Sequence, residues 1–211
     1  ATLLGLAFHL YDPDKHLSNQ EDVGISLALI PTNHAGVEIG KRHYPAYLSF
    51  MNGPTSGKAV FIPFDFIIGG KPMLGKGWRM LMECLSAGRS ISLPALASAT
   101  GKLSYRMTGA YARIRKQFNV SIANFEGVEF ALGRIAGLTY LLEATRLMTV
   151  HAVDLGLSPA IVSAIAKYHT TEMSRQIIND AMDIHAGRGI QQGPKNYLAN
   201  HYRGMPVAIT V

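Results

Sequence analysis

The sequence has little cysteine and no long apolar run. Its one cysteine, Cys84, excludes a disulfide within the 211-residue chain and is typical of a reducing compartment. The first residues lack the charged-then-apolar plan of a signal peptide. The longest helical stretches carry charges such as Arg134, Glu143 and Lys167, so none offers the ~18 apolar residues of a membrane span. We therefore expect a cytoplasmic protein, with peripheral attachment to a membrane left open.

Low-complexity tracts and internal repeats are also missing, and acidic residues are in the minority. Hydrophobic residues make up 48% of the chain, enough for a sizeable core in one large domain or two smaller ones. Lys and Arg number 20 against 14 Asp and Glu, which gives a formal net charge of +6. The cations are scattered apart from small groups at 41–43 and 113–116. A solvated surface explains this charge best, an anionic ligand comes next, and nucleic acid third.

Both ends of the chain are apolar. It starts ATLLGLAFHL, without Met, and stops at PVAITV, whereas soluble domains usually end in polar, exposed residues. The sequence therefore predicts an interior fragment of a longer protein.

The pattern of apolar residues divides the chain into a β-like part and a helical part. Three short apolar runs bounded by turn residues predict strands at 3–10, 24–30 and 58–62. Later periodic segments predict helices at 77–118, at about 126–155, from Pro159 to Gly187, and at 195–203. Long helices joined by short loops form an antiparallel bundle. The expected fold class is α+β, with a partial β domain over 1–74 and a helical bundle over 75–211.

Helical periodicity also predicts which faces are buried. The expected inward residues are Leu81, Met82, Leu85, Leu96, Leu103 and Met107 in the first helix, Val128, Leu132, Ile135, Leu138 and Leu142 in the second, and Ile161, Ile165, Tyr168, Ile177, Ala181 and Ile184 in the third. Pro94 predicts a bend in the first helix. Ser158 is the expected N-cap of the third helix.

Two glycine-rich segments are candidates for phosphate binding. Residues 70–77 approach the pattern G-x-x-x-x-G-K-[ST], but Gly77 replaces the hydroxyl residue that would hold Mg²⁺, so a flexible connector is favoured. Residues 187–193 have one residue too many for G-x-G-x-x-G and follow a helix. Their spacing alone therefore favours a helix C-cap over phosphate contact.

Other polar groups carry weaker signals. His169 and Glu172 have a spacing that metal ligands use, but no second pair accompanies them. Glu83 lies beside Cys84 without a histidine close in sequence, so we expect Cys84 to be a small buried residue rather than a nucleophile. The segment Arg115–Phe118 places two cations and a ring at a helix end. It either complements the helix dipole or clamps a diphosphate and a planar ring.

Six segments of the chain carry a family resemblance. They are ALIPTNHAGVEIGKRHYP, NGPTSGKAVFIPFDFIIGG, GKGWRMLMECLSAGRSISLP, YARIRKQF, KYHTTEMSRQIINDAMDIHAGRGI and GMPVAITV. Together they resemble the acyl-CoA dehydrogenases, in particular the large bacterial fatty acyl-CoA dehydrogenases of β-oxidation. The resemblance covers essentially the whole chain. It implies that residues 1–74 are the later part of a middle β domain, and that 75–211 are most of a C-terminal helical bundle.

The resemblance implies sites for FAD and for acyl-CoA. In the family, FAD lies between domains and across a subunit interface, and an Arg-x-x-Phe segment reaches the FAD of a neighbouring subunit. The matching cofactor residues are Arg115, Lys116, Gln117 and Phe118, then Glu126, and then Asp183, Ile184, His185, Ala186 and Gly187. The acyl-CoA contacts match Ser86 and Arg89. The family often has Gln at Asp183 and at Glu126. A carboxylate near phosphate is unfavourable, so Asp183 needs a cation such as Arg188 or points elsewhere.

The activity implied is FAD-dependent α,β-dehydrogenation of saturated fatty acyl-CoA to trans-2-enoyl-CoA. Electrons would pass to an electron-transfer flavoprotein, and the protein would form a homodimer or a larger homo-oligomer. In most of the family the carboxylate base directly follows the segment matching AITV, so we expect it immediately after Val211. A minority of members place this base on the helix at 77–118, and the matching residue here is Gly88, which has no side chain. The 211-residue chain alone is therefore expected to be inactive and to hold FAD poorly.

Two alternative hypotheses stay open. One is an acyl-CoA oxidase or a nitroalkane-oxidising flavoprotein of the same fold, which would consume oxygen without another electron acceptor. The other is a nucleic-acid-binding relative, which the charge of +6 allows and which salt-dependent DNA binding would support. We expect neither nucleic-acid binding nor a metal site.

Overall fold

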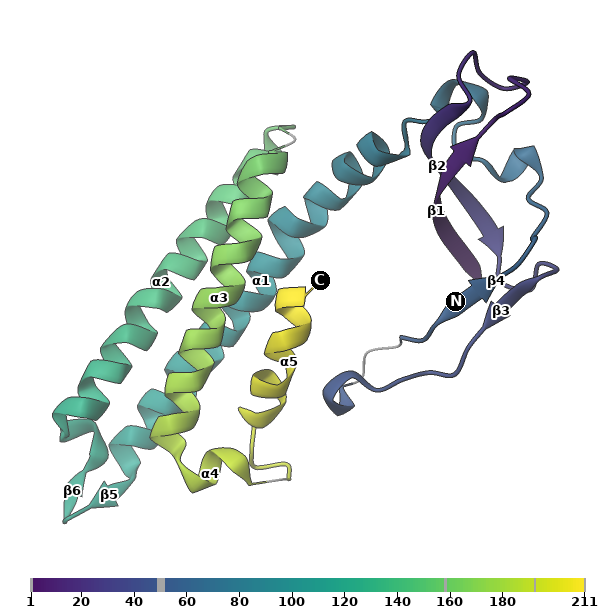
Figure 1. The fold of residues 1–211 in the computed structure, drawn as a ribbon. Helices are drawn as coiled ribbons and strands as arrows, with labels where there is room; N and C mark the ends of the chain where they lie inside the picture. The colour runs from purple at the N-terminus through teal and green to yellow at the C-terminus, as the bar shows by residue number, and fades with distance from the viewer. Residues whose placement is uncertain (1, 49–51, 158, 192, 211) are drawn as a thin grey trace. The chain divides into compact units, whose positions relative to one another are not determined.

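The structure, a computed structural model, describes residues 2–48, 52–157, 159–191 and 193–210 (Figure 1). It divides into two compact units, Ala1–Cys84 and Leu85–Val211, and the helix α1 (Gly77–Ile114) contains the point of division. The β-like and helical parts confirm the predicted α+β class. The expected domain boundary at residue 74 stays a prediction. Within the described ranges, no helix is long and apolar enough to cross a membrane.

The first unit is built on a two-stranded antiparallel ribbon. β1 (Leu3–Tyr11) pairs with β2 (Asp22–Pro31), with Ala7 opposite Leu27. Side chains of a strand alternate between two faces, and in β2 the buried residues Ser26, Ala28 and Ile30 share one face. The two strands predicted in this stretch are therefore confirmed.

The loop between these strands is closed by a buried carboxylate. Asp12 accepts hydrogen bonds from the backbone N–H groups of His16, Leu17 and Ser18 at 2.7–3.0 Å. Burial by itself raises the pKa of Asp12, but the three hydrogen bonds outweigh it and the pKa is lowered overall. Asp12 thus stays charged and fixes the loop.

The strand predicted at 58–62 is wrong. The structure instead pairs β3 (Val37–Ile39) with β4 (Thr55–Gly57), and the chain then bends. Ala59 has a φ of 50°, which extended backbone does not allow. Short 3₁₀ turns complete the unit at Pro45–Tyr47, Phe64–Phe66 and Lys71–Met73.

The glycine-rich segment 70–77 packs against β2 instead of forming a free loop. The N–H of Gly75 donates to Ser26 Oγ at 3.0 Å. A Cβ at Gly75 would lie 2.1 Å from Val23 O, and a Cβ at Gly77 would lie 2.8 Å from Ile25 O. These glycines are needed for close approach to a strand, so the predicted flexible connector is in fact a packed junction.

The second unit is a helical bundle with a small hairpin. Its elements are α1 from Leu85 onward, β5 (Lys116–Gln117), β6 (Val120–Ser121), the 3₁₀ turn Ile122–Asn124, α2 (Glu126–Asp154), α3 (Ala160–His185), α4 (Gly187–Ile190) and α5 (Ala199–Thr210). α2 contacts α3, which also contacts α5 (Figure 1). α2 agrees with its prediction within a residue, whereas α5 lies further along the chain than the predicted helix at 195–203. The N-cap expected at Ser158 lies outside the described residues.

α1 is continuous through Pro94, which a neighbouring helix makes possible. Proline has no N–H, so the carbonyl four residues earlier loses its usual partner. That carbonyl belongs to Ser90, and the hydroxyl of Thr149 on α2 donates to it at 2.6 Å. A side chain of α2 thereby replaces the missing bond of α1.

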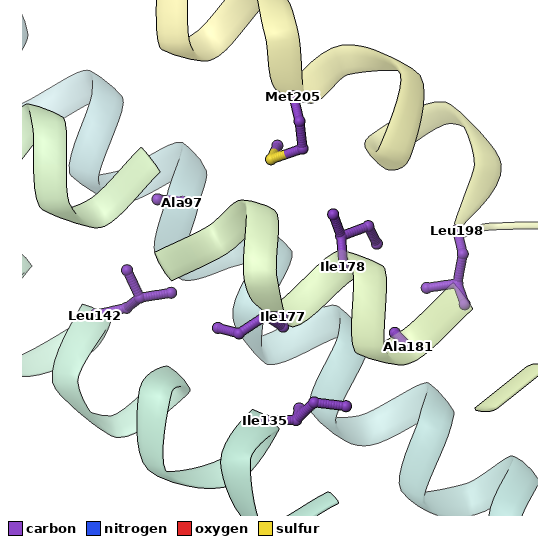
Figure 2. Close-up of a cluster of buried hydrophobic side chains, with 8 residues drawn as sticks. All are labelled: Ala97, Ile135, Leu142, Ile177, Ile178, Ala181, Leu198 and Met205. Carbon is purple, nitrogen blue, oxygen red and sulfur yellow. The ribbon is translucent and has the colours of Figure 1, made fainter. Parts of the chain in front are cut away.

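The apolar core of the bundle confirms the buried face predicted for α2. Figure 2 shows its side chains converging from several helices: Ala97, Ile135, Leu142, Ile177, Ile178, Ala181, Leu198 and Met205. Ile135 and Leu142 come from α2, and Ile177 and Ala181 from the second half of α3. This part of the bundle follows ordinary apolar periodicity.

The buried faces predicted for α1 and for the first half of α3 are wrong. Leu85, Leu96 and Met107 are 48%, 46% and 37% exposed, and Ile161, Ile165 and Tyr168 are 77%, 55% and 60% exposed. Cys84, expected to be buried, is exposed as well. The residues buried instead are small and largely polar: Ser86, Ser90, Ser98, Thr100, Ser104 and Thr108 on α1, and Ser163, Thr170, Thr171 and Ser174 on α3.

Several of these small residues are buried at low cost because their hydroxyls bond to the helix backbone, whereas Ser104 and Thr108 have no hydrogen-bond partner among the described residues. Ser90 donates to Ser86 O at 2.8 Å, and Thr170 donates to Ala166 O at 2.7 Å, each four residues back. Ser90 and Ser163 also form a hydrogen bond between α1 and α3. Small side chains at these two positions allow their hydroxyls to meet directly.

Candidate functional site

A cavity of about 520 Å³, called here the hairpin cavity, lies where the β5–β6 hairpin meets the end of α3. Its lining residues are Tyr111, Arg115, Gln117, Ile122, Ile184, His185, Ala186, Gly187, Arg188 and Gln191. It therefore brings together parts of the two segments predicted to bind a cofactor, Arg115–Phe118 and Asp183–Gly187. The predicted roles of these residues stay predictions, but their proximity is a finding.

Arg115 is positioned by the sharp end of α1. Its N–H donates to Tyr111 O at 2.9 Å, and its carbonyl accepts from the N–H of Ile122 at 2.9 Å. Ser121 Oγ donates to Ala112 O at 2.7 Å and so satisfies a terminal carbonyl of α1. The helix ends before the predicted residue 118 because the chain reverses at once into the β5–β6 hairpin.

The opposite wall is positioned by the end of α3. Ala186 has a φ of 49°, and its N–H donates to the carbonyls of Met182 and Asp183 at 2.9 and 3.1 Å. Gly189 is buried behind the turn, where a Cβ would lie 3.2 Å from Met182 O and 3.4 Å from His185 Cβ. The chain therefore turns tightly here, and the glycine allows α4 to lie against the last turn of α3.

His185 forms a neutral, stacked part of this wall. It is 4% exposed, and its ring stacks on Tyr111 with centroids 4.3 Å apart. Nδ1 lies 2.9 Å from Ala181 O, to which it can donate, and Nε2 is buried without a partner among the described residues. Burial lowers the pKa of His185, the bond to Ala181 opposes this, and the charge of Arg188 lowers it further.

The charged side chains that line the hairpin cavity are Arg115 and Arg188, and in the described chain no carboxylate joins them. Guanidinium groups pair with phosphate through two parallel hydrogen bonds. A stacked Tyr–His wall beside them suits an apolar or aromatic neighbour. The arrangement therefore fits a molecule that carries phosphate next to a planar group.

Asp183 lies in a different place from Arg115. It lines a second cavity of about 580 Å³ with Asn179, Met182, Ala186, Ile190 and Tyr202. Of the two lining sets, only Ala186 is common to both. The structure thus places this carboxylate apart from the two arginines of the hairpin cavity, and its role in cofactor binding stays a prediction.

The remaining predicted residues are not brought into the hairpin cavity. Lys116 is exposed in β5, Phe118 is 89% exposed at the hairpin turn, and Glu126 is exposed at the start of α2. Ser86 is 7% exposed, and Arg89 is partly exposed on α1.

Four residues of the cavity lining were not among the predicted cofactor residues, namely Tyr111, Ile122, Arg188 and Gln191. Tyr111 lies four residues before Arg115, so it falls on the same face of a helix. That spacing could have identified Tyr111, and the glycine-rich segment 187–193 contains Arg188 and Gln191, whereas no local pattern marks Ile122.

The weak metal and nucleophile signals find no support. Within the described ranges, no group of three or more His, Cys, Asp or Glu could hold a metal ion. Glu172 lies 3.6 Å from Arg175, and His169 makes an edge contact with Tyr168. Glu83 accepts a hydrogen bond from Arg79 at 2.7 Å. These groups act as ordinary surface pairs.

The arrangement of a β unit followed by this bundle matches solved acyl-CoA dehydrogenase structures. The acyl-CoA dehydrogenase from Geobacillus kaustophilus gives a TM-score of 0.85 at 23% identity, over 99% of this chain and 52% of that chain. Butyryl-CoA dehydrogenase from Megasphaera elsdenii gives a TM-score of 0.80 at 20% identity, over 99% of this chain and 51% of that chain. At such identities the likeness establishes the fold alone.

The sequence establishes the family. The family described as acyl-CoA dehydrogenase, C-terminal domain, matches residues 75–210. Because this match covers more than half of the sequence, the chain belongs to the acyl-CoA dehydrogenase family, whose members are FAD-dependent oxidoreductases.

Individual relatives match this chain over only part of their own length. Protein HemX of Proteus mirabilis is 58% identical over 49% of this chain and 61% of its own length. The 3-(aryl)acrylate reductase of Clostridium sporogenes is 31% identical over 79% and 43%. Probable acyl-CoA dehydrogenase FadE10 of Mycobacterium tuberculosis is 27% identical over 87% of this chain and 28% of its own length. The chain thus spans from 28% to 61% of these relatives.

Proposed function

We propose that the chain is part of an enzyme that uses FAD to convert saturated fatty acyl-CoA to trans-2-enoyl-CoA in fatty acid β-oxidation. The observation that carries this proposal is the hairpin cavity, in which Arg115 and Gln117 meet Ile184, His185 and Gly187. These residues belong to the two segments that the family resemblance assigns to the cofactor. Membership of the acyl-CoA dehydrogenase family supports the same reaction class.

The hairpin cavity fits the phosphate-bearing part of FAD. Arg115 and Arg188 would bind the diphosphate, since both line the cavity. The stack of Tyr111 on His185 forms an aromatic wall beside them. FAD supplies, when bound, the acceptor for the hydride that leaves the β carbon of the substrate. Gly88 on α1 has no side chain to serve as the base that removes the α proton.

A second copy of the chain would complete the site. Phe118 is 89% exposed on the β5–β6 hairpin, as expected if the ring contacts a cofactor held by another subunit. Ile161, Ile165 and Tyr168 form an exposed stripe along α3, since residues four and three apart share a helix face. Exposed apolar patches often mark protein interfaces. We therefore include a homodimer or larger homo-oligomer in the proposal.

The proposal extends to the substrate, the electron acceptor and the location. Ser86 and Arg89 would contact the acyl-CoA, and an electron-transfer flavoprotein would take the electrons. A relative from Acetobacterium woodii, 28% identical over 79% of this chain, is named as a subunit of a caffeyl-CoA reductase–Etf complex, which supports such a partner. A cytoplasmic location with peripheral membrane attachment would suit this substrate.

Reduction of enoyl-CoA is a second candidate, because several relatives are named reductases. The 3-(aryl)acrylate reductase shares 31% identity with this chain, and acryloyl-CoA reductase (NADH) of Anaerotignum propionicum shares 26% over 86% of it. Reduction is the reverse of dehydrogenation, so one cofactor site serves both directions. The direction is decided by assay and not by the residues of the hairpin cavity.

Replacement of Arg115 tests the proposed site. In the protein expressed from its whole reading frame, Arg115→Ala should weaken FAD binding by about 10-fold to 100-fold, the effect of losing a charged hydrogen bond. Arg113→Ala is the matched control, because Arg113 is an exposed arginine two residues earlier and lies outside both the cavity lining and the segment assigned to the cofactor. FAD affinity is measured by flavin fluorescence titration of the apoprotein. Equal affinity in wild type and Arg115→Ala would refute the site.

The reaction is tested on the same wild-type protein. Reduction of the bound flavin by a saturated fatty acyl-CoA, with transfer to an electron-transfer flavoprotein, supports dehydrogenation. Turnover of an enoyl-CoA with a reduced donor supports the reductase. Oxygen consumption without an added acceptor supports the oxidase hypothesis. A wild-type protein that binds no FAD would overturn all three.

A further inference from the structure

One side chain, Asn196, bonds to the segments on both of its sides. Its Nδ2 lies 2.6 Å from the carbonyl oxygens of Gly189 and Gln191 and 3.4 Å from that of Arg188. Its Oδ1 accepts from the N–H groups of Leu198 and Ala199, each at 3.0 Å. Carbonyl oxygens only accept and N–H groups only donate, so these partners fix which way the carboxamide faces.

On one side Asn196 holds a turn that belongs to the hairpin cavity. Arg188 and Gln191 line that cavity, and Gly189 between them is buried against the end of α3. The turn is therefore fixed from behind by the packing of Gly189 and from the far side by the carboxamide of Asn196. Together these contacts set where the backbone of Arg188 lies.

On its other side Asn196 begins a well-anchored helix. Ala199 is the first residue of α5, and a side-chain oxygen that accepts from the first N–H groups stabilises a helix start. Two contacts attach α5 to α3. Ser174 Oγ of α3 lies 3.5 Å from Met205 Sδ of α5, and Lys167 Nζ of α3 donates to Ile209 O of α5. The turn is thus joined to a helix whose middle and last turn contact α3.

We propose that Asn196 is a positioning residue for the cofactor site, and this inference rests on the proposed function. Its two N–H groups place the turn that carries Arg188, so that the guanidinium meets the cofactor phosphate without reorganisation of the backbone. Its oxygen ties this placement to α5. Supporting hydrogen bonds of this kind hold binding groups at productive geometry.

Three substitutions separate the two halves of the carboxamide. Asn196→Asp keeps an oxygen for Leu198 and Ala199 but removes the donors and turns a negative oxygen toward the carbonyls of the turn. Asn196→Ala removes both halves. Asn200→Ala is the matched control, because Asn200 lies four residues further on and its side chain accepts a hydrogen bond from Arg203, outside the turn.

Two measurements are made on the protein expressed from its whole reading frame, at a temperature where every variant is folded. Hydrogen exchange reports on the backbone amides of 187–191 and 198–199, and fluorescence titration gives the affinity for FAD. We expect Asn196→Asp to speed exchange in 187–191, to leave 198–199 protected, and to weaken FAD binding about 10-fold. Asn196→Ala should speed exchange in both segments, and Asn200→Ala should change neither measurement.

The outcomes separate this inference from the proposed function. Wild-type exchange in 187–191 of Asn196→Asp would overturn the positioning role. Faster exchange there with wild-type FAD affinity would show that the turn does not serve the cofactor, and would also overturn it. A wild-type protein that binds no FAD would refute the proposed function and the cofactor role of Asn196 together. A loss of stability alone would not reproduce the expected split between the two segments.

Discussion

At the scale of single residues, His185 is controlled by burial and by a neighbouring charge. Its pKa lies below the ordinary value of 6.5 because its ring is buried against Tyr111 and Tyr197 and because Arg188 is cationic. The unfolded chain therefore takes up a proton at a higher pH than the folded chain. By linkage, the free energy of unfolding falls as the pH is lowered through 6.5.

A variant that cannot titrate tests this pH dependence. His185→Phe keeps a ring to stack on Tyr111 and cannot be protonated. Its free energy of unfolding should therefore fall less than that of wild type between pH 7.5 and pH 5.5. These two pH values lie about one unit on either side of the ordinary pKa of histidine. Urea unfolding gives the free energies. Burial also lowers the pKa of His201, so the variant should retain part of the effect. An equal fall in both proteins would contradict the assignment.

The family resemblance, and not the spacing of the residues, predicted part of the candidate site. The resemblance pointed to Arg115 and Gln117 and to Ile184 through Gly187, and the structure brings these residues together in one cavity. Asn196 could not be predicted in the same way. Its role depends on the exact fold of the turn at 187–191, and an isolated Asn is common in turns of many kinds.

At the scale of elements, the carboxylate of Glu143 joins α1 to α2. It accepts from Ser98 Oγ at 2.6 Å, from Lys102 Nζ at 3.0 Å, and from Arg146 on its own helix at 2.6 and 2.9 Å. Its hydrogen bonds to Arg146, Ser98 and Lys102, in that order of effect, hold its pKa far below the ordinary value of 4.5. The ionised carboxylate therefore stabilises the fold fully at every pH above the ordinary pKa of 4.5. This stabilisation is lost as the medium becomes strongly acid and Glu143 is protonated.

Removing this charge should cost stability at neutral pH. Glu143→Gln keeps the shape of the side chain but leaves Arg146 and Lys102 without their counter-charge, so the free energy of unfolding should fall by about 1–3 kcal/mol. Glu172→Gln is the matched control, because Glu172 pairs with Arg175 at the longer distance of 3.6 Å. Urea unfolding at pH 7 should show a clearly larger loss for Glu143→Gln. Equal losses would show that the network linking α1 to α2 adds nothing.

Helix α1 shows why apolar periodicity fails for part of the bundle. The prediction placed Leu85, Leu96 and Met107 inside, but small polar residues occupy the buried face. Serine and threonine can be buried in a helix because their hydroxyls bond to carbonyls of the same helix. A pattern that counts only large apolar residues cannot detect such a face. In α2, where Ile135 and Leu142 supply the core, apolar periodicity predicted the buried face correctly.

At the scale of the whole molecule, the class and order of the elements were predictable from sequence. The β-like beginning, the long helices and the α+β class are confirmed, whereas the strand at 58–62 and the bounds of the last helix are wrong. The strand failed because Ala59 adopts a positive φ. The last helix was displaced because Asn196 fixes its start by hydrogen bonds to Leu198 and Ala199. Both depend on contacts that a local pattern does not contain.

The proposed oligomer is tested through the exposed stripe of α3. Ile165 is 55% exposed between Ile161 and Tyr168, so Ile165→Lys should disrupt association without disturbing the core. Ser92→Lys, at an exposed polar position of α1, is the control. Sedimentation velocity of the protein expressed from its whole reading frame should show an oligomer for wild type and the control. The Ile165→Lys variant should sediment as a monomer, and an unchanged sedimentation coefficient would refute the interface.

The contacts between α1 and α2 also restrict how the length of the chain can vary. Thr149 bonds to Ser90, and Glu143 bonds to Ser98 and to Lys102 one turn further on. One inserted residue turns the rest of a helix by about 100° and moves it by ~1.5 Å. After an insertion between Ser90 and Ser98, α2 could therefore keep its bond to Ser90 or its bonds to Ser98 and Lys102, but not both. Natural and engineered insertions should be tolerated in the loops, while the spacing from Ser90 to Lys102 stays constant.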